Sequence, residues 1–240
     1  PYTTLFRSGR WLITCDHATN HVPPMVNGGT LDLPADQMGR HIAYDIGAAG
    51  VTRRLAEKLE SPAILSNFSR LVIDPNRGED DPTLIMKVYD GTIIPGNRHI
   101  DAAEVERRKQ LCYRPYHAAL EALAARREDT VIVAVHSFTP RLYGRHPRPW
   151  QLGILHAYDG RYAVPLIERL RQETDLFVGD NEPYPGHLPG DSIDRHALHH
   201  GRPNALIELR HDLIADAAGQ IHWADRLAPI LEQVLAATQL

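Results

Sequence analysis

The chain has 240 residues, of which 43% are hydrophobic and 23% are charged, and its formal net charge is −4 at pH 7. This composition is typical of a globular protein, and without a basic stripe neither nucleic acid nor an acidic membrane surface is an expected partner. No run approaches the ~18 apolar residues that a membrane span requires. Two cysteines without a CxxC motif indicate a reduced, cytoplasmic protein.

The first eight residues, PYTTLFRS, are unusual for the start of a natural protein. They are what CCC TAC ACG ACG CTC TTC CGA TCT encodes, and this DNA resembles a common short-read sequencing adapter. We therefore predict that residues 1–8 are an artefact, to be set aside like a tag, and that residues 9–240 form a single α/β domain. On this interpretation the natural protein begins before Gly9, and a targeting segment could have preceded it.

The expected elements begin with a buried strand at residues 12–15, which ends at Asp16-His17. Two prolines then turn the chain outward, because proline cannot continue a strand ladder. A helix is predicted over residues 37–60, since Asp36 can cap it and its apolar residues recur with helical spacing. Polar and titratable side chains therefore stand at the C-terminal end of the first strand, where ligands collect in α/β proteins.

The middle of the chain contains a long polar segment between two expected regular elements. Residues 63–68 read as a strand and residues 71–73 as a continued extended segment. The loop at 78–98 is rich in Gly, Asp and Pro, and loops of that length in compact domains are usually functional. An amphipathic helix is expected over 101–127, kinked or split at Pro115.

The second half of the chain alternates strands with helices. Residues 131–135 are a continuous apolar run that ends at His136, the strongest buried-strand signal in the sequence. This alternation predicts a three-layer α/β/α sandwich around a mainly parallel or mixed sheet. The remaining expected strands are 152–156, 176–179 and 205–209, and the remaining helices are 161–173 and 217–237.

Three apolar strands end in a similar way, in the segments WLITCDH, VIVAVHSFTP and ALIELRHD. His17 and His136 should stand at one sheet edge, and Glu208 lies in the third strand. Asp45 interrupts an otherwise apolar helical segment, HIAYDIGA. Carboxylates in such apolar surroundings are expensive to bury unless they are paired, metal-bound or catalytic. Two histidines and a carboxylate with one open position is the arrangement of a catalytic zinc site, although other divalent metals accept the same ligands.

Each of these residues also has a purely structural interpretation. His17 can cap a turn, and His136 can be a hydrogen-bonded histidine at the end of a strand. Asp45 can pair with a neighbouring arginine, and Glu208 can pair with Arg210. The sequence contains no HExxH-type motif to decide between these readings. The functional interpretation gains weight because several of the signals point to one sheet edge.

A second group of residues has the chemistry of a carboxylate clamp. Asn76-Arg77 follows an apolar segment and a proline, and an arginine beside an amide can hold a carboxylate through paired donors. Arg70 has the same potential, and the alternative for both arginines is an exposed position in a turn. Residues 194–200, DRHALHH, are expected to form a mobile polar loop over the site.

Together the segments CDHATNHVP, HIAYDIGA, FSRLVIDPNR, IPGN, AVHSFTP, GDNEPY and IELRHDL, in this order, resemble the N-formylglutamate amidohydrolase family. The resemblance runs from about Trp11 to the final helix. It implies a fold similar to that of the zinc-dependent exopeptidases. It also implies a Zn²⁺ ion held by His17, Asp45 and His136, with Glu208 as the general base.

The resemblance further implies where a small-molecule substrate, an N-acyl amino acid, is held. Asn76 and Arg77 match the pair expected to bind its carboxylate, with Arg70 nearby. Asn181 and His196 fall on motif positions expected near the substrate. The implied reaction is hydrolysis of the formamide C–N bond of N-formyl-L-glutamate, or of a close N-acyl amino acid, to formate and the free amino acid.

The segments also depart from the family branch that degrades histidine. The chain has Ala18-Thr19 after His17 where that branch has Gly-Thr, and His211 follows IELR where Gln is more usual. These departures keep two alternatives open. One is a deacylase or small carboxypeptidase acting on another N-acyl amino acid, and the other is a non-catalytic metal-binding protein, which would have no need of Glu208. The sequence makes no prediction of the oligomeric state.

Overall fold

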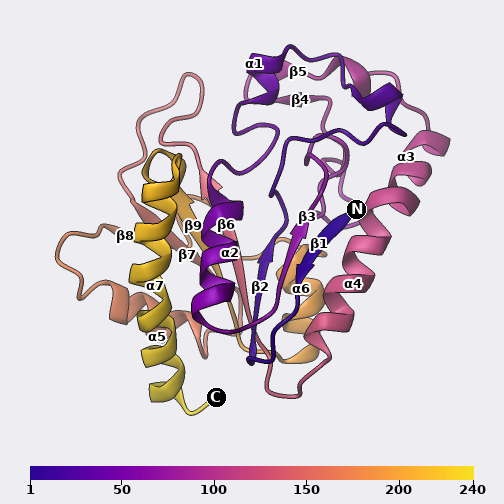
Figure 1. Cartoon of the computed structure of the whole chain (residues 1–240). Coiled ribbons are helices and arrows are strands. Elements are labelled where there is room, and N and C mark those ends of the chain that lie inside the picture. The colour runs from indigo at the N-terminus through magenta and orange to yellow at the C-terminus, as the bar shows by residue number, and fades with distance from the viewer.

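The computed structural model describes residues 1–240, and its centre is a seven-stranded mixed sheet of order β1-β3-β2-β6-β9-β7-β8 (Figure 1). Strands β3, β2, β6 and β9 run parallel, whereas β1 is antiparallel to β3 and β7 is antiparallel to β9. The strands are β1 Tyr2–Leu5, β2 Trp11–Cys15, β3 Ala63–Ser66, β6 Val131–Phe138, β7 Leu152–Leu155, β8 Val178–Asp180 and β9 Asn204–Arg210.

Helices cover both faces of this sheet. One cluster of 33 buried residues packs one face under α2, α5 and α7, and a second cluster of 27 packs the other face under α4 and α6. The expected three-layer α/β/α architecture with a mixed sheet is therefore confirmed. The helices are α1 Ala35–Met38, α2 Ala48–Lys58, α3 Ala102–Arg108, α4 Arg114–Ala124, α5 Ala163–Leu170, α6 Ser192–His196 and α7 Ala217–Thr238.

The alternation of side chains along the central strands sets the direction of the polar residues. In β6, Val133 and Val135 belong to the cluster under α2 and α7, whereas Ala134 belongs to the opposite cluster. His136 therefore faces the α4 and α6 side, since side chains alternate along a strand. Glu208 in β9 faces the same side of the sheet, and it is the register partner of His136. Two titratable side chains thus lie side by side on one face of the sheet.

The helix expected over residues 37–60 is wrong in its first half. Only α1 and α2 are helical, and a turn region separates them. Gly47, the residue before α2, has a φ of +80°, and a Cβ there would collide with the carbonyl oxygen of Ile214. The Asp45 backbone N–H donates to the His17 carbonyl at 2.9 Å. The break in the helix therefore brings Asp45 beside the end of β2, which a continuous helix would not do.

The region after β3 also differs from expectation. Residues 71–73 are not a strand, because residues 70–72 form a turn, and buried Arg108 donates to the Val72 carbonyl at 3.0 Å. The long loop contains a small hairpin, β4 Val88–Tyr89 and β5 Thr92–Ile93. The helix expected over 101–127 is divided just before Pro115, since a π-helical segment, Lys109–Tyr113, separates α3 from α4, which has Pro115 in its first turn.

The residues before Gly9 have a defined place in this structure. Tyr2–Leu5 form the edge strand β1, with Tyr2 opposite Ser66 and Leu5 opposite Ala63. Our interpretation of the origin of residues 1–8 stays a prediction.

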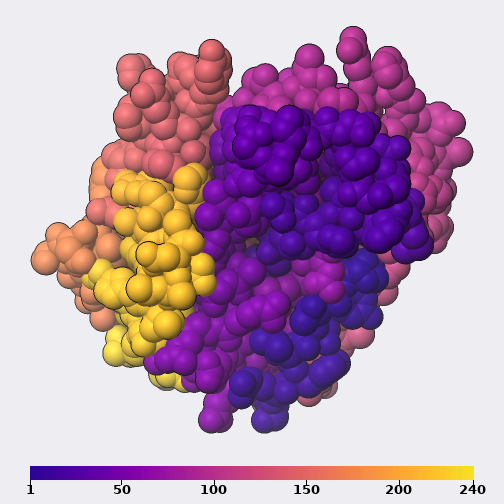
Figure 2. Space-filling view, turned by 45° about the horizontal axis from the view of Figure 1, so that its top comes forward, coloured from indigo at the N-terminus to yellow at the C-terminus, as the bar shows by residue number.

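The loops at the C-terminal ends of the parallel strands gather at one end of the molecule. Figure 1 shows α1, β4 and β5 at that end, and Figure 2 turns it forward, with the segment near residues 140–150 standing beside the N-terminal loops. No helix combines the length and the apolar character needed to cross a bilayer.

Candidate active site

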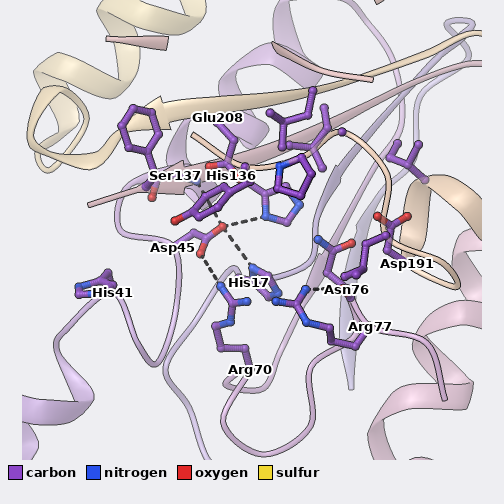
Figure 3. Close-up of a pocket in the computed structure, with 18 of the residues that line it drawn as sticks. His17, His41, Asp45, Arg70, Asn76, Arg77, His136, Ser137, Asp191 and Glu208 are labelled. Atoms are coloured by element: carbon purple, nitrogen blue, oxygen red, sulfur yellow. Dashed lines mark hydrogen bonds and ion pairs between the residues drawn. The ribbon is translucent and has the colours of Figure 1, made fainter. Parts of the chain in front are cut away.

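A cavity of about 220 Å³ opens at this end of the sheet, and it brings together most of the expected functional residues (Figure 3). His17 follows β2, His136 stands near the C-terminal end of β6, and Glu208 lies in β9. Asp45 comes from the turn before α2, and loop residues after β3 complete one wall. Binding sites at the carboxyl ends of parallel strands are the rule in α/β folds.

The two histidines converge on one carboxylate oxygen. Nδ1 of His17 lies 3.2 Å and Nδ1 of His136 lies 2.9 Å from Oδ2 of Asp45, and all three residues are buried. One ligand atom from each residue falls within a group less than 4.8 Å across. Nitrogen and oxygen donors in this number, facing a cavity, are a set that Zn²⁺ and several other divalent ions accept. This group could hold a metal ion.

The outward-facing nitrogen of each imidazole meets a second carboxylate. Nε2 of His17 lies 2.7 Å from Oδ1 of Asp74, and Nε2 of His136 lies 3.5 Å from Oδ2 of Asp16. Metal-binding histidines characteristically donate their other N–H to a carboxylate, which fixes the tautomer and the ring orientation. His17 has this hydrogen bond, and Nε2 of His136 faces its carboxylate at the longer distance, so the surroundings of the pair fit a metal centre.

These contacts shift the pKa values in opposite directions. Burial opposes ionisation of Asp16, but the hydrogen bond and positive charge of His136 outweigh it and lower the Asp16 pKa to about 2. Burial likewise opposes the charged form of His136, yet its bonds to Asp16 and Asp45 raise its pKa well above the usual range. The pocket therefore stabilises positive charge between the carboxylates, where a cation would sit.

Arg70 occupies the pocket wall with its charge already compensated. Its Nη2 donates to Oδ2 of Asp74 at 2.7 Å, and its Nη1 reaches Oδ1 of Asp45 at 3.4 Å. Its guanidinium carbon also stands 5.3 Å from the ring centroid of Tyr89. In this structure Arg70 orients the acidic residues around the histidines, and its predicted contact with substrate stays a prediction.

Glu208 is a buried carboxylate with an unused oxygen. Its side chain lines the cavity beside His136, and Oε2 has no hydrogen-bond partner. Burial raises its pKa to about 7, against the opposing positive charge of His136. A buried, unpartnered carboxylate in a cavity calls for a functional explanation, since such groups are otherwise paired.

Asn76 and Arg77 form the opposite wall and provide an unpaired cation. Nη1 of Arg77 donates to the Asn76 carbonyl at 2.8 Å and Nε donates to Thr83 Oγ1 at 3.1 Å, but no carboxylate contacts the guanidinium. Oδ1 of Asn76 accepts from the Ser192 backbone N–H at 3.3 Å. The loop is thus tied to α6, and the arginine keeps free donors for an anion.

Two predicted substrate residues lie outside this cavity. Oδ1 of Asn181 accepts from the His156 backbone N–H at 2.8 Å, which ties the end of β8 to the end of β7. His196 is buried between His117 and Glu121, at 2.9 Å from each. The structure does not bring Asn181 or His196 together with the metal ligands, and their contact with substrate stays a prediction.

The mobile polar loop expected over residues 194–200 is wrong. Residues up to His196 belong to α6, and Leu198–His200 form a 3₁₀ turn. Asp194 and His196 are both buried. Asp191 caps α6 by accepting from the Asp194 N–H at 2.8 Å, so the helix has a defined start.

Sequence reasoning missed several residues of the pocket. Asp16 and Asp74 were visible as polar residues in the motifs CDH and VIDPNR, yet the histidine that each contacts is set only by the fold. His41, Tyr184 and Asp191 also line the cavity. A helix-cap signal, Asp-Ser-x-Asp, could have indicated the position of Asp191 but not its exposure to the pocket.

Comparison with known proteins decides the family. A family model described as N-formylglutamate amidohydrolase matches residues 9–215. The chain belongs to this family. It is therefore an amidohydrolase.

Solved structures agree with this placement. A gene product from Agrobacterium tumefaciens shares 34% identity with the chain at a TM-score of 0.93, covering 100% of this chain and 96% of the other. The N-formylglutamate amidohydrolase from Ralstonia eutropha JMP134 shares 23% identity at a TM-score of 0.64, with 100% and 98% covered, and shows a common fold. No curated protein sequence is detectably similar to the chain.

Proposed function

We propose that the chain is a zinc-dependent amidohydrolase that cleaves the formamide bond of N-formyl-L-glutamate, or the amide bond of a close N-acyl amino acid. Formate, or the corresponding acid, and the free amino acid are the products. The observation that carries the proposal is the unpartnered carboxylate oxygen of Glu208, buried in the cavity beside His17, Asp45 and His136. A purely passive metal site would have no use for that carboxylate.

His17, Asp45 and His136 are the residues that would hold the ion. Two imidazoles and one carboxylate, each imidazole backed by a further carboxylate, match catalytic zinc centres, and another divalent ion is the alternative. A bound zinc ion would acidify a water molecule and polarise the amide carbonyl. The protein's own contribution is to keep three donors directed at one point.

Glu208 acts as the general base and then as the general acid. Its carboxylate accepts the proton of the attacking water and delivers it to the leaving nitrogen, so one water is consumed for each amide bond broken. Because burial raises its pKa to about 7, the group can both take up and release a proton near neutral pH. No protein group hydrogen-bonds to Oε2, so the carboxylate has no competing partner there when it accepts a proton.

Arg77 and Asn76 hold the carboxylate of the amino acid. The guanidinium has no anionic partner in the protein, and the loop that carries it is fixed to α6 through Asn76. A carboxylate bound there aligns the amide with the base and converts binding energy into orientation.

We expect a cytoplasmic setting, since Cys15 and Cys112 are both free and buried.

The deciding experiment is formate release from N-formyl-L-glutamate by purified protein. We expect activity that disappears on chelation, returns on adding Zn²⁺, and co-purifies with about one metal ion per chain. The same assay with N-acetyl and N-formyl derivatives of other amino acids distinguishes hydrolysis of N-formyl-L-glutamate from hydrolysis of another N-acyl amino acid. Folded, zinc-loaded protein that hydrolyses no member of this panel would overturn the proposal.

A further inference from the structure

We infer that the amino-acid side chain of the substrate is uncharged, and that an N-acyl derivative of a neutral, apolar amino acid fits this pocket better than one of glutamate. The inference rests on the proposed function and deepens it by naming the substrate class. It follows from the number of unpaired positive charges that the cavity offers.

The cavity lining contains two arginines and no lysine. Arg70 is neutralised by Asp74 and Asp45, to which it donates through three nitrogens. Arg77 alone lacks an acidic partner. One unpaired guanidinium can neutralise one carboxylate, and the proposed alignment uses it for the carboxylate next to the scissile amide. A dicarboxylic amino acid would leave its second carboxylate without a cation.

The histidines do not supply the missing charge. His17 and His136 belong to the metal group, and Nε2 of His41 already faces Asp90 at 3.1 Å. Burial lowers the pKa of His41, so this ring is neutral at pH 7. Arg148 packs its guanidinium against the rings of Phe138 and Tyr184 and is not among the lining residues.

Apolar side chains and a further carboxylate also line the cavity. Leu155, Ile193 and Leu206 line the cavity and are each less than 8% exposed. Asp191 stands on the same side as Asn76 and Arg77 (Figure 3) and is 7% exposed. Burial raises the pKa of Asp191 to about 6, so it is largely ionised at pH 7 and repels a second substrate carboxylate.

Burying a carboxylate against leucines and another carboxylate is unfavourable, whereas an aliphatic side chain gains from the same contact.

The cleanest comparison uses two ligands of nearly equal shape, N-formyl-L-glutamate and N-formyl-L-glutamine. With zinc-loaded protein we expect kcat/KM for the glutamine derivative to exceed that for the glutamate derivative by about 10-fold or more. N-formyl-L-leucine and N-formyl-L-methionine should be better still.

A variant identifies the source of the discrimination. Asp191→Asn removes the charge but keeps a residue that can cap α6. We expect the ratio of kcat/KM for the glutamate derivative to that for the glutamine derivative to rise several-fold in this variant. An unchanged ratio, or a wild-type preference for N-formyl-L-glutamate, would overturn the inference.

Binding separates this inference from the proposed reaction. Calorimetric titration of the same ligands into Glu208→Gln protein measures affinity without turnover. Tighter binding of the leucine and glutamine derivatives than of the glutamate derivative supports the inference even if the wild-type protein hydrolyses none of them, an outcome that would refute only the reaction. Equal or tighter binding of the glutamate derivative, or no binding of any ligand, overturns it.

Discussion

The protein buries two histidine clusters, and they differ in what the imidazoles face. In the first, His17 and His136 both direct Nδ1 at Asp45, and their other nitrogens face further carboxylates. In the second, Nδ1 of His117 contacts Nε2 of His196 at 2.9 Å, with the two rings stacked 5.1 Å apart. In the first cluster the ring nitrogens converge on one point, whereas in the second His117 contacts His196 and the other nitrogen of His196 contacts Glu121.

The charges around the two clusters explain the difference. Contacts of its ring N–H groups with the Asp16 and Asp45 carboxylates raise the pKa of His136 well above its usual range, against the effect of burial. Burial, together with the positive charges of His196 and Arg195, lowers the pKa of His117 to about 3. A site for a cation thus requires convergent donors and an excess of carboxylate, and the number of histidines alone does not identify it.

The largest effect should come from removing a ligand of the first cluster. His136→Ala is expected to lose nearly all bound metal and all activity, because two ligands rarely hold zinc against competition from water. His196→Ala is the matched control, since it removes a buried histidine from the second cluster. It should retain about one metal ion per chain by elemental analysis.

Circular dichroism must show that both variants fold before the metal contents are compared. If the folded His136→Ala protein kept full metal, or the folded His196→Ala protein lost it, the assignment of the two clusters would be reversed.

The next largest effect concerns Glu208. Glu208→Gln keeps the shape of the side chain but cannot accept a proton, so kcat should fall by about 10²- to 10⁴-fold, the range of general acid–base catalysis. Metal content should stay unchanged, because Glu208 is outside the ligand group. Measuring both quantities on one preparation distinguishes loss of the base from loss of the ion. Activity within a few-fold of the wild type would remove Glu208 from the mechanism.

The same carboxyl sets the expected pH profile. Glu208 must be ionised to act as a base, and burial raises its pKa to about 7. Below that pH the group is protonated, so kcat/KM should fall as the pH decreases and level off above neutrality. Bound zinc would move this acid limb to lower pH by stabilising the carboxylate. A profile that rises toward low pH would contradict the assignment.

The sequence predicts the ends of the strands well and the turns between them poorly. His17, His136 and Glu208 follow from apolar runs that terminate in titratable residues, and runs of this kind depend on local pattern alone. Asp45 was expected on a continuous helix, because nothing in its neighbours reveals that Gly47 adopts a positive φ against Ile214. Such a close approach between distant segments exists only in the folded chain.

Asp16 and Asp74, whose carboxylates face Nε2 of the two histidines, were not predicted for the same reason. Asp74 lies far from His17 in sequence, and their 2.7 Å contact depends on the turn at residues 70–72. A local pattern can indicate which residues are polar at a strand end. It cannot indicate which nitrogen of which histidine each of them meets.

A smaller effect is expected when one of these supporting carboxylates is neutralised. Asp74→Asn should weaken metal affinity by about 10- to 100-fold, the usual result of removing the partner of a ligating histidine. Competition with a chromogenic chelator measures this change. Glu121→Gln is the matched control, because Glu121 supports His196 in the second cluster at 2.9 Å. Equal losses in the two variants would show that general destabilisation, rather than support of His17, is being measured.

The last effect concerns stability and belongs to the second cluster. Burial, with the charges of His196 and Arg195, keeps His117 neutral in the folded protein with a pKa of about 3, whereas the unfolded chain binds a proton near pH 6.5. Stability from this group is therefore complete above pH 6.5 and is lost as the pH falls toward 3, by about 1.4 kcal/mol for each pH unit.

Urea denaturation of metal-free protein at several pH values between 6.5 and 5 tests this expectation. The wild type should lose stability more steeply than His117→Gln, which has no imidazole at this position to protonate on unfolding. The carboxylates of the first cluster contribute in a lower window, since their folded pKa values lie below those of the unfolded chain. Parallel curves for the two proteins between pH 6.5 and 5 would show that His117 is protonated as readily in the folded protein as in the unfolded chain, and the contrast between the clusters would then rest on geometry alone.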